Sequence, residues 1–106
     1  MIKCSFMIPV YLENNIRLKD FVSVVGEAEV SSIESLAREA KSVSVMCINS
    51  TSFGGGVAEI LHDIVPLMRD VGLDASWNVI EGPIDFFKVT KKIHNALQGM
   101  IVDLSK

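Results

Sequence analysis

Three consecutive glycines, Gly54 to Gly56, separate an apolar run from a segment with helical periodicity. Residues without side chains at the start of a helix leave backbone N–H groups accessible, and these groups carry a partial positive charge. Such a turn can bind a phosphate, a carboxylate or the hydroxyl groups of a sugar. The same glycines can also serve only a tight turn and close packing of the helix on a sheet. Both interpretations stay open, and they are compatible.

The glycine fingerprints of nucleotide-binding proteins fit this run poorly. The dinucleotide motif G-x-G-x-x-G would use Gly54 and Gly56, but Glu59 stands at its third glycine, and a carboxylate in the first helical turn repels a pyrophosphate. The phosphate loop G-x-x-x-x-G-K-[ST] needs a lysine and a hydroxyl residue that do not follow these glycines. We therefore expect neither NAD binding nor hydrolysis of ATP or GTP.

Two histidines are the other candidates for chemistry. His62 has no serine, cysteine or carboxylate partner fixed near it by the sequence, so a packed or capping role is predicted rather than a role as a base. His94 lies near Lys91 and Asn95 in the last helical segment. That group forms either a solvated polar face or an edge that contacts a sugar. We predict no catalytic residue from these patterns.

The two cysteines, Cys4 and Cys47, lack the spacing of metal ligands and are too few for a disulfide framework. Cys47 lies in an apolar strand and is expected to be a buried, unreactive thiol. Trp77, which alternates with Val79 on its strand, is predicted to lie in the core. We expect no metal and no cofactor.

Length and composition favour one soluble domain. The chain has 106 residues, of which 49% are hydrophobic, and its formal net charge is −3. This balance excludes a disordered tail and a basic surface for nucleic acid. The longest apolar run is far shorter than the roughly 20 residues that span a membrane, and no signal-peptide cleavage site follows it. The expected location is the cytoplasm, with no nucleic-acid or membrane partner.

Hydrophobic periodicity predicts an α/β fold. The run from Ser42 to Asn49 is typical of a parallel strand covered on both faces. A second strand is predicted from Ala75 to Glu81, before the break at Gly82 and Pro83. Between the strands a helix begins near Val57, with an inward stripe of Ile60, Leu61, Ile64, Met68 and Val71.

The ends and the neighbours of that helix can also be predicted. Gly72 should end it in the left-handed conformation, and Pro66 should bend it between residues 62 and 66. A helix over residues 27–42 precedes the first strand, and another over residues 85–99 ends at Gly99. The last helix has Phe86, Phe87, Thr90, Ile93 and Leu97 inward and Lys88, Lys91, Lys92 and Asn95 mostly outward. The two strands and their helix form a βαβ unit with one flanking helix on each side.

Two blocks of sequence are specific enough to compare with a known family: "NSTSFGGGVAEILHDIVPLMRDVGLDASWNVIEGP" and "FFKVTKKIHNALQG". Together they resemble the N-terminal region of trehalose synthases of the glycosyl-transferring type and their trehalose phosphorylase relatives. The resemblance covers residues 18–99, with an unassigned extended segment at 1–17 and a tail at 100–106.

This resemblance implies a retaining glycosyltransferase of the GT-B type, in which two Rossmann-like domains face a cleft. The chain would then be an incomplete Rossmann-like half-domain, with a short parallel sheet flanked by helices. The resemblance places the glycine loop at the substrates, which makes Gly54, Gly55, Gly56 and Val57 candidates for binding. Lys91, His94 and Asn95 are carried over as possible contacts to the acceptor sugar.

Three functions remain open at this point. The first is a truncated part of an enzyme that forms trehalose from a nucleotide-activated glucose and glucose, inactive alone because the donor-binding domain has no counterpart. The second is a stand-alone binding or assembly module, and the third is a subunit of a split glycosyltransferase. A sugar or sugar nucleotide would bind weakly, if at all. We also expect a homodimer, with the strand-like run from Cys4 to Leu12 as the pairing element, because Pro9 confines it to a sheet edge.

Overall fold

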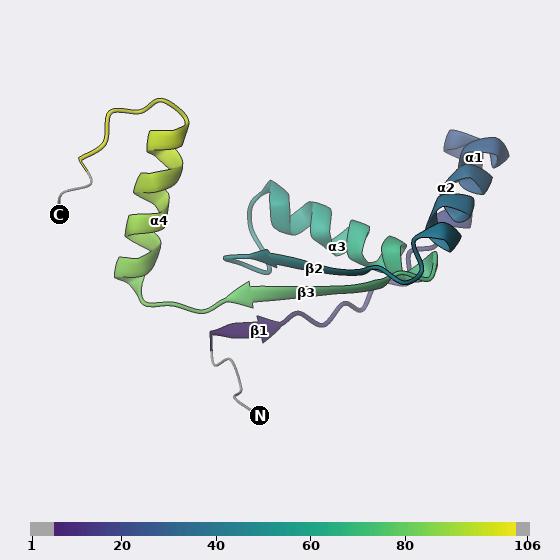
Figure 1. The fold of residues 1–106 in the computed structure, drawn as a ribbon, viewed down its shortest axis with the longest axis horizontal. Helices are drawn as coiled ribbons and strands as arrows, with labels where there is room; N and C mark the ends of the chain where they lie inside the picture. Colours follow the sequence, from purple (N-terminus) through teal and green to yellow (C-terminus); the bar gives the residue numbers. More distant parts are fainter. Residues whose placement is uncertain (1–5, 104–106) are drawn as a thin grey trace.

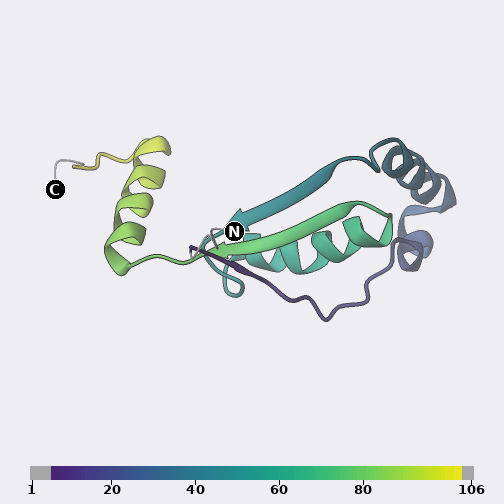
Figure 2. The same ribbon diagram turned by 60° about the horizontal axis from the view of Figure 1, so that its bottom comes forward.

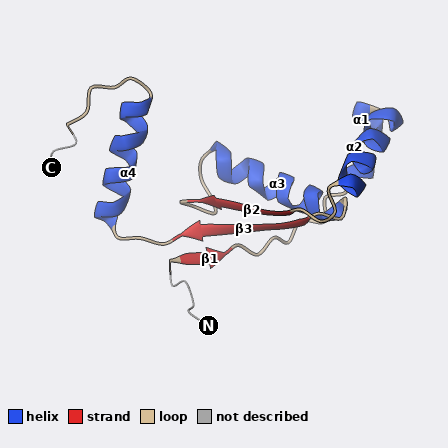
Figure 3. Cartoon of the chain, in the orientation of Figure 1, coloured by secondary structure: helices blue, strands red, loops and turns tan. Residues whose placement is uncertain are grey.

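The computed structural model describes residues 6–103 as an α/β fold around a small three-stranded sheet (Figure 1). The elements in chain order are β1 (Met7–Pro9), the 3-10 helix η1 (Leu18–Phe21), α1 (Val22–Val25), α2 (Glu27–Glu39), β2 (Ser44–Asn49), α3 (Gly56–Asp70), β3 (Asp74–Ile80) and α4 (Ile84–Leu97). The strand order in the sheet is β1-β3-β2. Figure 3 shows that helices flank this sheet at both ends as well as along one face.

The central unit is the predicted βαβ motif. Strands β2 and β3 pair in parallel, with Cys47 opposite Trp77, and α3 connects them. α2 precedes this unit and α4 follows it. The expected order of helix, strand, helix, strand and helix is therefore confirmed.

The N-terminal strand corrects the prediction of an all-parallel sheet. β1 pairs antiparallel with β3, with Ile8 opposite Val79, so the sheet is mixed. Pro9 lies on the edge strand, as expected, because an edge tolerates the missing N–H. Residues 7–9 of the run that was expected to seek a second chain thus already have a partner in their own chain. Cys4 lies outside the described residues.

The core lies between α3 and one face of the sheet (Figure 2). Trp77 and Val65 are 1% and 0% exposed, and Ala58 and Ala75 complete the buried cluster. Leu61 and Met68 pack against it. The predicted inward stripe of α3 was therefore partly wrong, since Ile60 and Ile64 are 60% and 42% exposed.

The opposite face of the sheet is open, which contradicts the prediction of a strand covered on both faces. Burial alternates along β2, and Met46 and Ile48 are 57% and 48% exposed. The apolar residues of β2 do suit two covered faces, but α3 covers only one of them (Figure 1).

The last helix stands apart from the sheet (Figure 2). No residue of α4 is buried, and Phe86, Ile93 and Leu97, which were predicted to face inward, are 43%, 45% and 83% exposed. The radius of gyration is 17.7 Å, against about 13 Å for a compact chain of this length. The prediction that this side of α4 faces inward was therefore wrong for these three residues.

Glycine ends both long helices of the second half, as predicted. Gly72 and Gly99 have φ angles of 94° and 88°. Each follows a helix whose last carbonyls accept the paired hydrogen bonds of a Schellman motif, such as Leu73 N–H to Met68 O at 3.0 Å. Pro66 is buried within α3, and the helix continues through it from Gly56 to Asp70.

Within residues 6–103, no helix has both the length and the apolar character that crossing a membrane requires.

Candidate functional site

The glycine loop connects β2 to α3 and depends on unusual backbone angles. Gly54 and Gly55 have φ angles of 75° and 92°. Gly55 also has ψ at 151°, which places it in a region that only glycine adopts readily. Gly56 has no positive φ, and a Cβ atom on any of the three would have nothing within 4 Å. The backbone angles of Gly54 and Gly55, and not crowding, therefore require glycine.

Side chains hold the start of this loop in place. The hydroxyl of Thr51 donates to the carbonyl oxygen of Phe53 at 2.6 Å. Nε2 of His62 lies 2.7 Å from the carbonyl oxygen of Ser52, to which it donates as N–H. The imidazole also meets the Trp77 ring edge to face, with centroids 4.9 Å apart. The predicted packed role of His62 and the predicted core position of Trp77 are both confirmed.

The N-terminus of α3 presents backbone donors. Gly55 is its N-cap and supplies no side-chain cap, so the first N–H groups of the helix have no intrahelical partner. Residues 53–57 are exposed. These N–H groups can donate hydrogen bonds to an anion or to a hydroxyl oxygen. The carboxylate of Glu59 in the first turn lowers the local positive potential.

An open cleft lies between the carboxyl ends of the two parallel strands and one side of α4. Its volume is about 620 Å³. The lining residues come from β2, β3, the loop after β2 and α4: Asn49, Ser50, Ile80, Phe86, Phe87, Thr90, Lys91 and His94. Ligands of α/β sheets bind at this edge.

The structure brings some of the predicted site residues together and separates others. Lys91 and His94 line the cleft. Asn95 lines a second groove of about 440 Å³ on α4, together with Lys88 and Lys92, and Lys91 borders both this groove and the cleft. The glycines and Val57 belong to neither lining. The sequence analysis missed Asn49, whose position at the end of the first firm strand was the signal that could have identified it.

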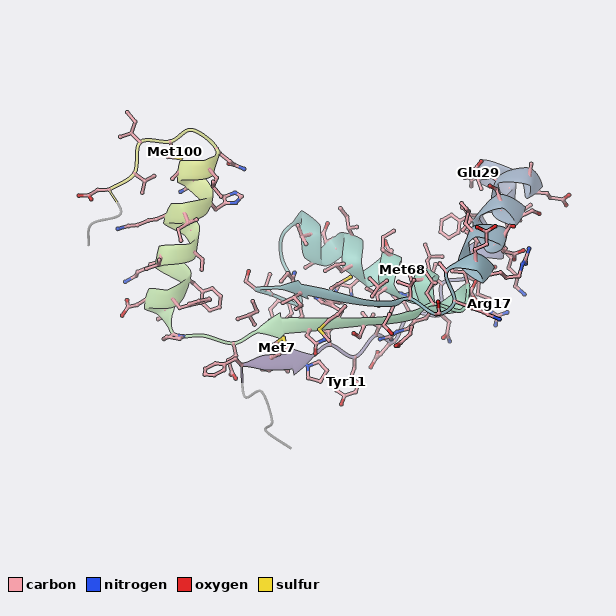
Figure 4. All side chains as sticks on the ribbon, viewed as in Figure 1. Met7, Tyr11, Arg17, Glu29, Met68 and Met100 are labelled. Atoms are coloured by element: carbon pink, nitrogen blue, oxygen red, sulfur yellow. The ribbon has the colours of Figure 1, made fainter. Side chains whose placement is uncertain are left out.

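Two further grooves lie near Arg17 and Met68, which are labelled in Figure 4. Arg17 lies at a polar groove with Arg69 and Asp70, and Met68 lies at an apolar groove between α2 and α3. Asp70 accepts a hydrogen bond from the N–H of Leu18 at 2.9 Å, and Nε of Arg69 donates to the Ala75 carbonyl at 2.7 Å. These contacts join η1, α3 and β3 at the end of the sheet opposite the cleft. Among residues 6–103, no group of three or more His, Cys, Asp or Glu could hold a metal ion.

The backbone angles of the loop predict different costs for two neighbouring substitutions. Gly55→Ala should destabilise the protein by about 1–3 kcal/mol, because alanine is strained at this φ and ψ. Gly56→Ala should change the free energy of unfolding by less than about 0.5 kcal/mol, as for an ordinary surface substitution. Urea unfolding followed by circular dichroism measures both. Equal effects of the two substitutions would contradict this account of the loop.

Comparison with known proteins bears on the glycine loop and the cleft alike. The model of the family described as trehalose synthase, N-terminal domain, matches residues 47–106. The trehalose synthase of Pyrococcus horikoshii is 59% identical over 83 residues, which are 78% of this chain and 20% of that protein. The trehalose synthase of Rubrobacter xylanophilus is 46% identical over 88 residues, 83% of this chain and 21% of that protein.

A trehalose phosphorylase of Grifola frondosa is 33% identical over 85 residues, 78% of this chain and 12% of that protein. The chain therefore spans about a fifth of the length of the trehalose synthases that it matches. The family match covers more than half of the chain and includes the end of β2, the glycine loop, α3, β3 and the helix that lines the cleft. On this basis, the chain belongs to the family of the trehalose synthase N-terminal domain.

Proposed function

We propose that this chain is the N-terminal, substrate-binding part of a retaining GT-B glycosyltransferase that forms trehalose from a nucleotide-activated glucose and glucose. The observation that carries the proposal is the cleft at the carboxyl ends of β2 and β3, where Lys91 and His94 of α4 face the strand ends in a chain of this family. The parallel βαβ unit is compatible with a Rossmann-like half-domain. The proposed location is the cytoplasm.

In this proposal the substrate meets the chain at two places. Backbone N–H groups near Gly55 to Val57 bind hydroxyl or phosphate oxygens, while Lys91 and His94 contact the acceptor sugar. Asn95 contributes only if its groove joins the same site when the remainder of the enzyme is present. These contacts are few, and the cleft is open.

Binding to the isolated chain should therefore be weak. We expect dissociation constants near the millimolar range, about −4 kcal/mol. An NMR titration with glucose, trehalose and phosphate should shift the backbone amides of Gly54 to Val57 and of Lys91 and His94 on α4. Shifts confined to the distant groove of Arg17 and Arg69 would contradict the proposed site.

A second function, in assembly, is favoured by the exposed apolar surface. The open face of the sheet presents Met46 and Ile48, and α4 presents Phe86, Ile93 and Leu97. We expect the remainder of the longer relatives to cover these faces. If a separate protein supplies that remainder here, the chain acts as a subunit of a split glycosyltransferase, and this protein is its partner. Without that partner, we propose that two copies of this chain cover the open face as a homodimer.

Light scattering with a matched pair of variants tests the homodimer. The unmodified chain should have the mass of two chains, and Ile48→Lys should shift it to one, because a charge would be buried in the shared face. Val24→Lys places the same charge on α1, where the side chain is already 78% exposed, and should remain dimeric. A single-chain mass at every concentration would refute the dimer, and a dimeric Ile48→Lys would refute this interface.

A further inference from the structure

The side chain of Asn49 has one fixed orientation at the wall of the cleft. The indole Nε1–H of Trp77 donates to Asn49 Oδ1 at 2.7 Å. Indole is a donor only, so its partner must be the oxygen of the amide and the NH₂ group must face away from Trp77. Trp77 is 1% exposed and its ring is held edge to face by His62. The donor that orients this amide is therefore itself immobile.

The NH₂ group of Asn49 is available to a ligand. In the part of the chain that the structure describes, Trp77 is the only side chain bonded to this amide. No buried side-chain nitrogen or oxygen among the same residues lacks a partner, so the unpaired NH₂ is reached by solvent. Asn49 is half-buried and lines the cleft. Its two donors are therefore open to solvent beside the cleft that Asn49 lines.

The opposite wall adds positive charge. Lys91 lines the cleft from α4, and within residues 6–103 it makes no ion pair of 4.0 Å or less. No aspartate or glutamate is among the residues that line the cleft. Oriented N–H donors and a cation without an opposing carboxylate favour a negatively charged oxygen over a neutral hydroxyl group.

We propose that Asn49 and Lys91 together bind a phosphate group in this cleft, and that Trp77 is the positioning residue that turns the Asn49 amide toward it. The inference rests on the proposed function, because it specifies which part of the substrates reaches the cleft. Free phosphate and the phosphate of an activated sugar have this chemistry in common. The ammonium group of Lys91 can also donate to a hydroxyl group of the acceptor sugar, but only a phosphate oxygen offers an opposite charge to it.

The test follows the side-chain amide resonances of Asn49 by NMR in the intact chain. Inorganic phosphate and glucose 1-phosphate should both shift them, and glucose at the same concentrations should not. A stronger effect of glucose 1-phosphate would identify a sugar phosphate as the ligand, and equal effects would identify free phosphate. A response to glucose alone would overturn the assignment of a phosphate.

Asn49→Asp removes the donors, adds a negative charge and keeps an acceptor oxygen for Trp77. It should weaken phosphate binding at least about tenfold with little change in the circular dichroism spectrum. Asn78→Asp is the matched control, because Asn78 precedes Val79 in β3, lies opposite Pro9 and Ile48 in the sheet, and is absent from the cleft lining. The control should bind phosphate as the unmodified chain does. Equal losses in the two variants would overturn the contact.

A double-mutant cycle tests the positioning role of Trp77. Trp77→Phe keeps an aromatic ring and removes the N–H that orients the amide. It should weaken phosphate binding about threefold in the chain with Asn49, and should have no effect in the Asn49→Ala background. The same loss in both backgrounds would show a merely structural role. In the NMR titration, two outcomes separate this inference from the proposed function. If glucose shifts the amides of Gly54 to Val57 but no probe shifts Asn49, this inference alone is overturned. If no probe shifts any resonance, the proposed function is overturned as well.

Discussion

Trp77→Ala is expected to destabilise the chain by about 3–5 kcal/mol, the usual cost of removing a buried tryptophan side chain. The ring is 1% exposed and belongs to a buried cluster of only four residues. Its loss would also remove the edge-to-face contact with His62 and leave Asn49 Oδ1 without its donor. Domains have total stabilities of about 5–15 kcal/mol, so this single change should remove a large share of the free energy of unfolding and lower the urea midpoint clearly.

Urea unfolding monitored by circular dichroism measures this effect. Leu36→Ala on α2 serves as the control, because that side chain is 62% exposed and its truncation should cost less than about 0.5 kcal/mol. A loss of less than about 1 kcal/mol for Trp77→Ala would mean that the packing between α3 and the sheet does not hold the βαβ unit together.

The 106-residue chain by itself is expected to form no trehalose. Transfer of a sugar requires groups that stabilise the leaving diphosphate and orient the donor and acceptor in a closed site. The described residues offer an open cleft, and the chain has about a fifth of the length of the trehalose synthases it matches. The measurement is trehalose produced from nucleotide-activated glucose and glucose by the purified chain. Production above a boiled control would contradict the expectation.

Local sequence patterns were enough to predict most of the elements. The glycines at positions 72 and 99 marked helix ends because only glycine adopts their φ without strain. The alternation around Trp77 predicted a strand with its tryptophan in the core. These features depend on residues that are close together in the chain, so they can be predicted from the sequence alone.

Long-range features could not be predicted in the same way. The pairing of residues 7–9 with β3 joins segments separated by some 70 positions, and neither segment specifies the direction of pairing. Which faces are covered also depends on distant partners, so the exposure of Met46 on β2 and of Leu97 on α4 was not predicted. Apolar composition indicates that a face can be buried, and does not identify the element that buries it.

The candidate site was predicted only in part for the same reason. Lys91 and His94 lie three positions apart on one side of α4, whereas Asn95 lines only the second groove, which Lys91 also borders. The role of Asn49 depends on a hydrogen bond to a residue 28 positions away. Such a contact becomes visible only when the two strands are placed side by side.

A chimera tests the central claim most directly, namely that this chain is functionally equivalent to the N-terminal part of a trehalose synthase. The 83 matched residues of this chain would replace their counterparts in the trehalose synthase of Pyrococcus horikoshii. The chimera would then be assayed beside the parent enzyme under conditions in which the parent makes trehalose. We predict that the chimera forms trehalose. A chimera that unfolds in the same temperature range as the parent enzyme but forms none would contradict the account.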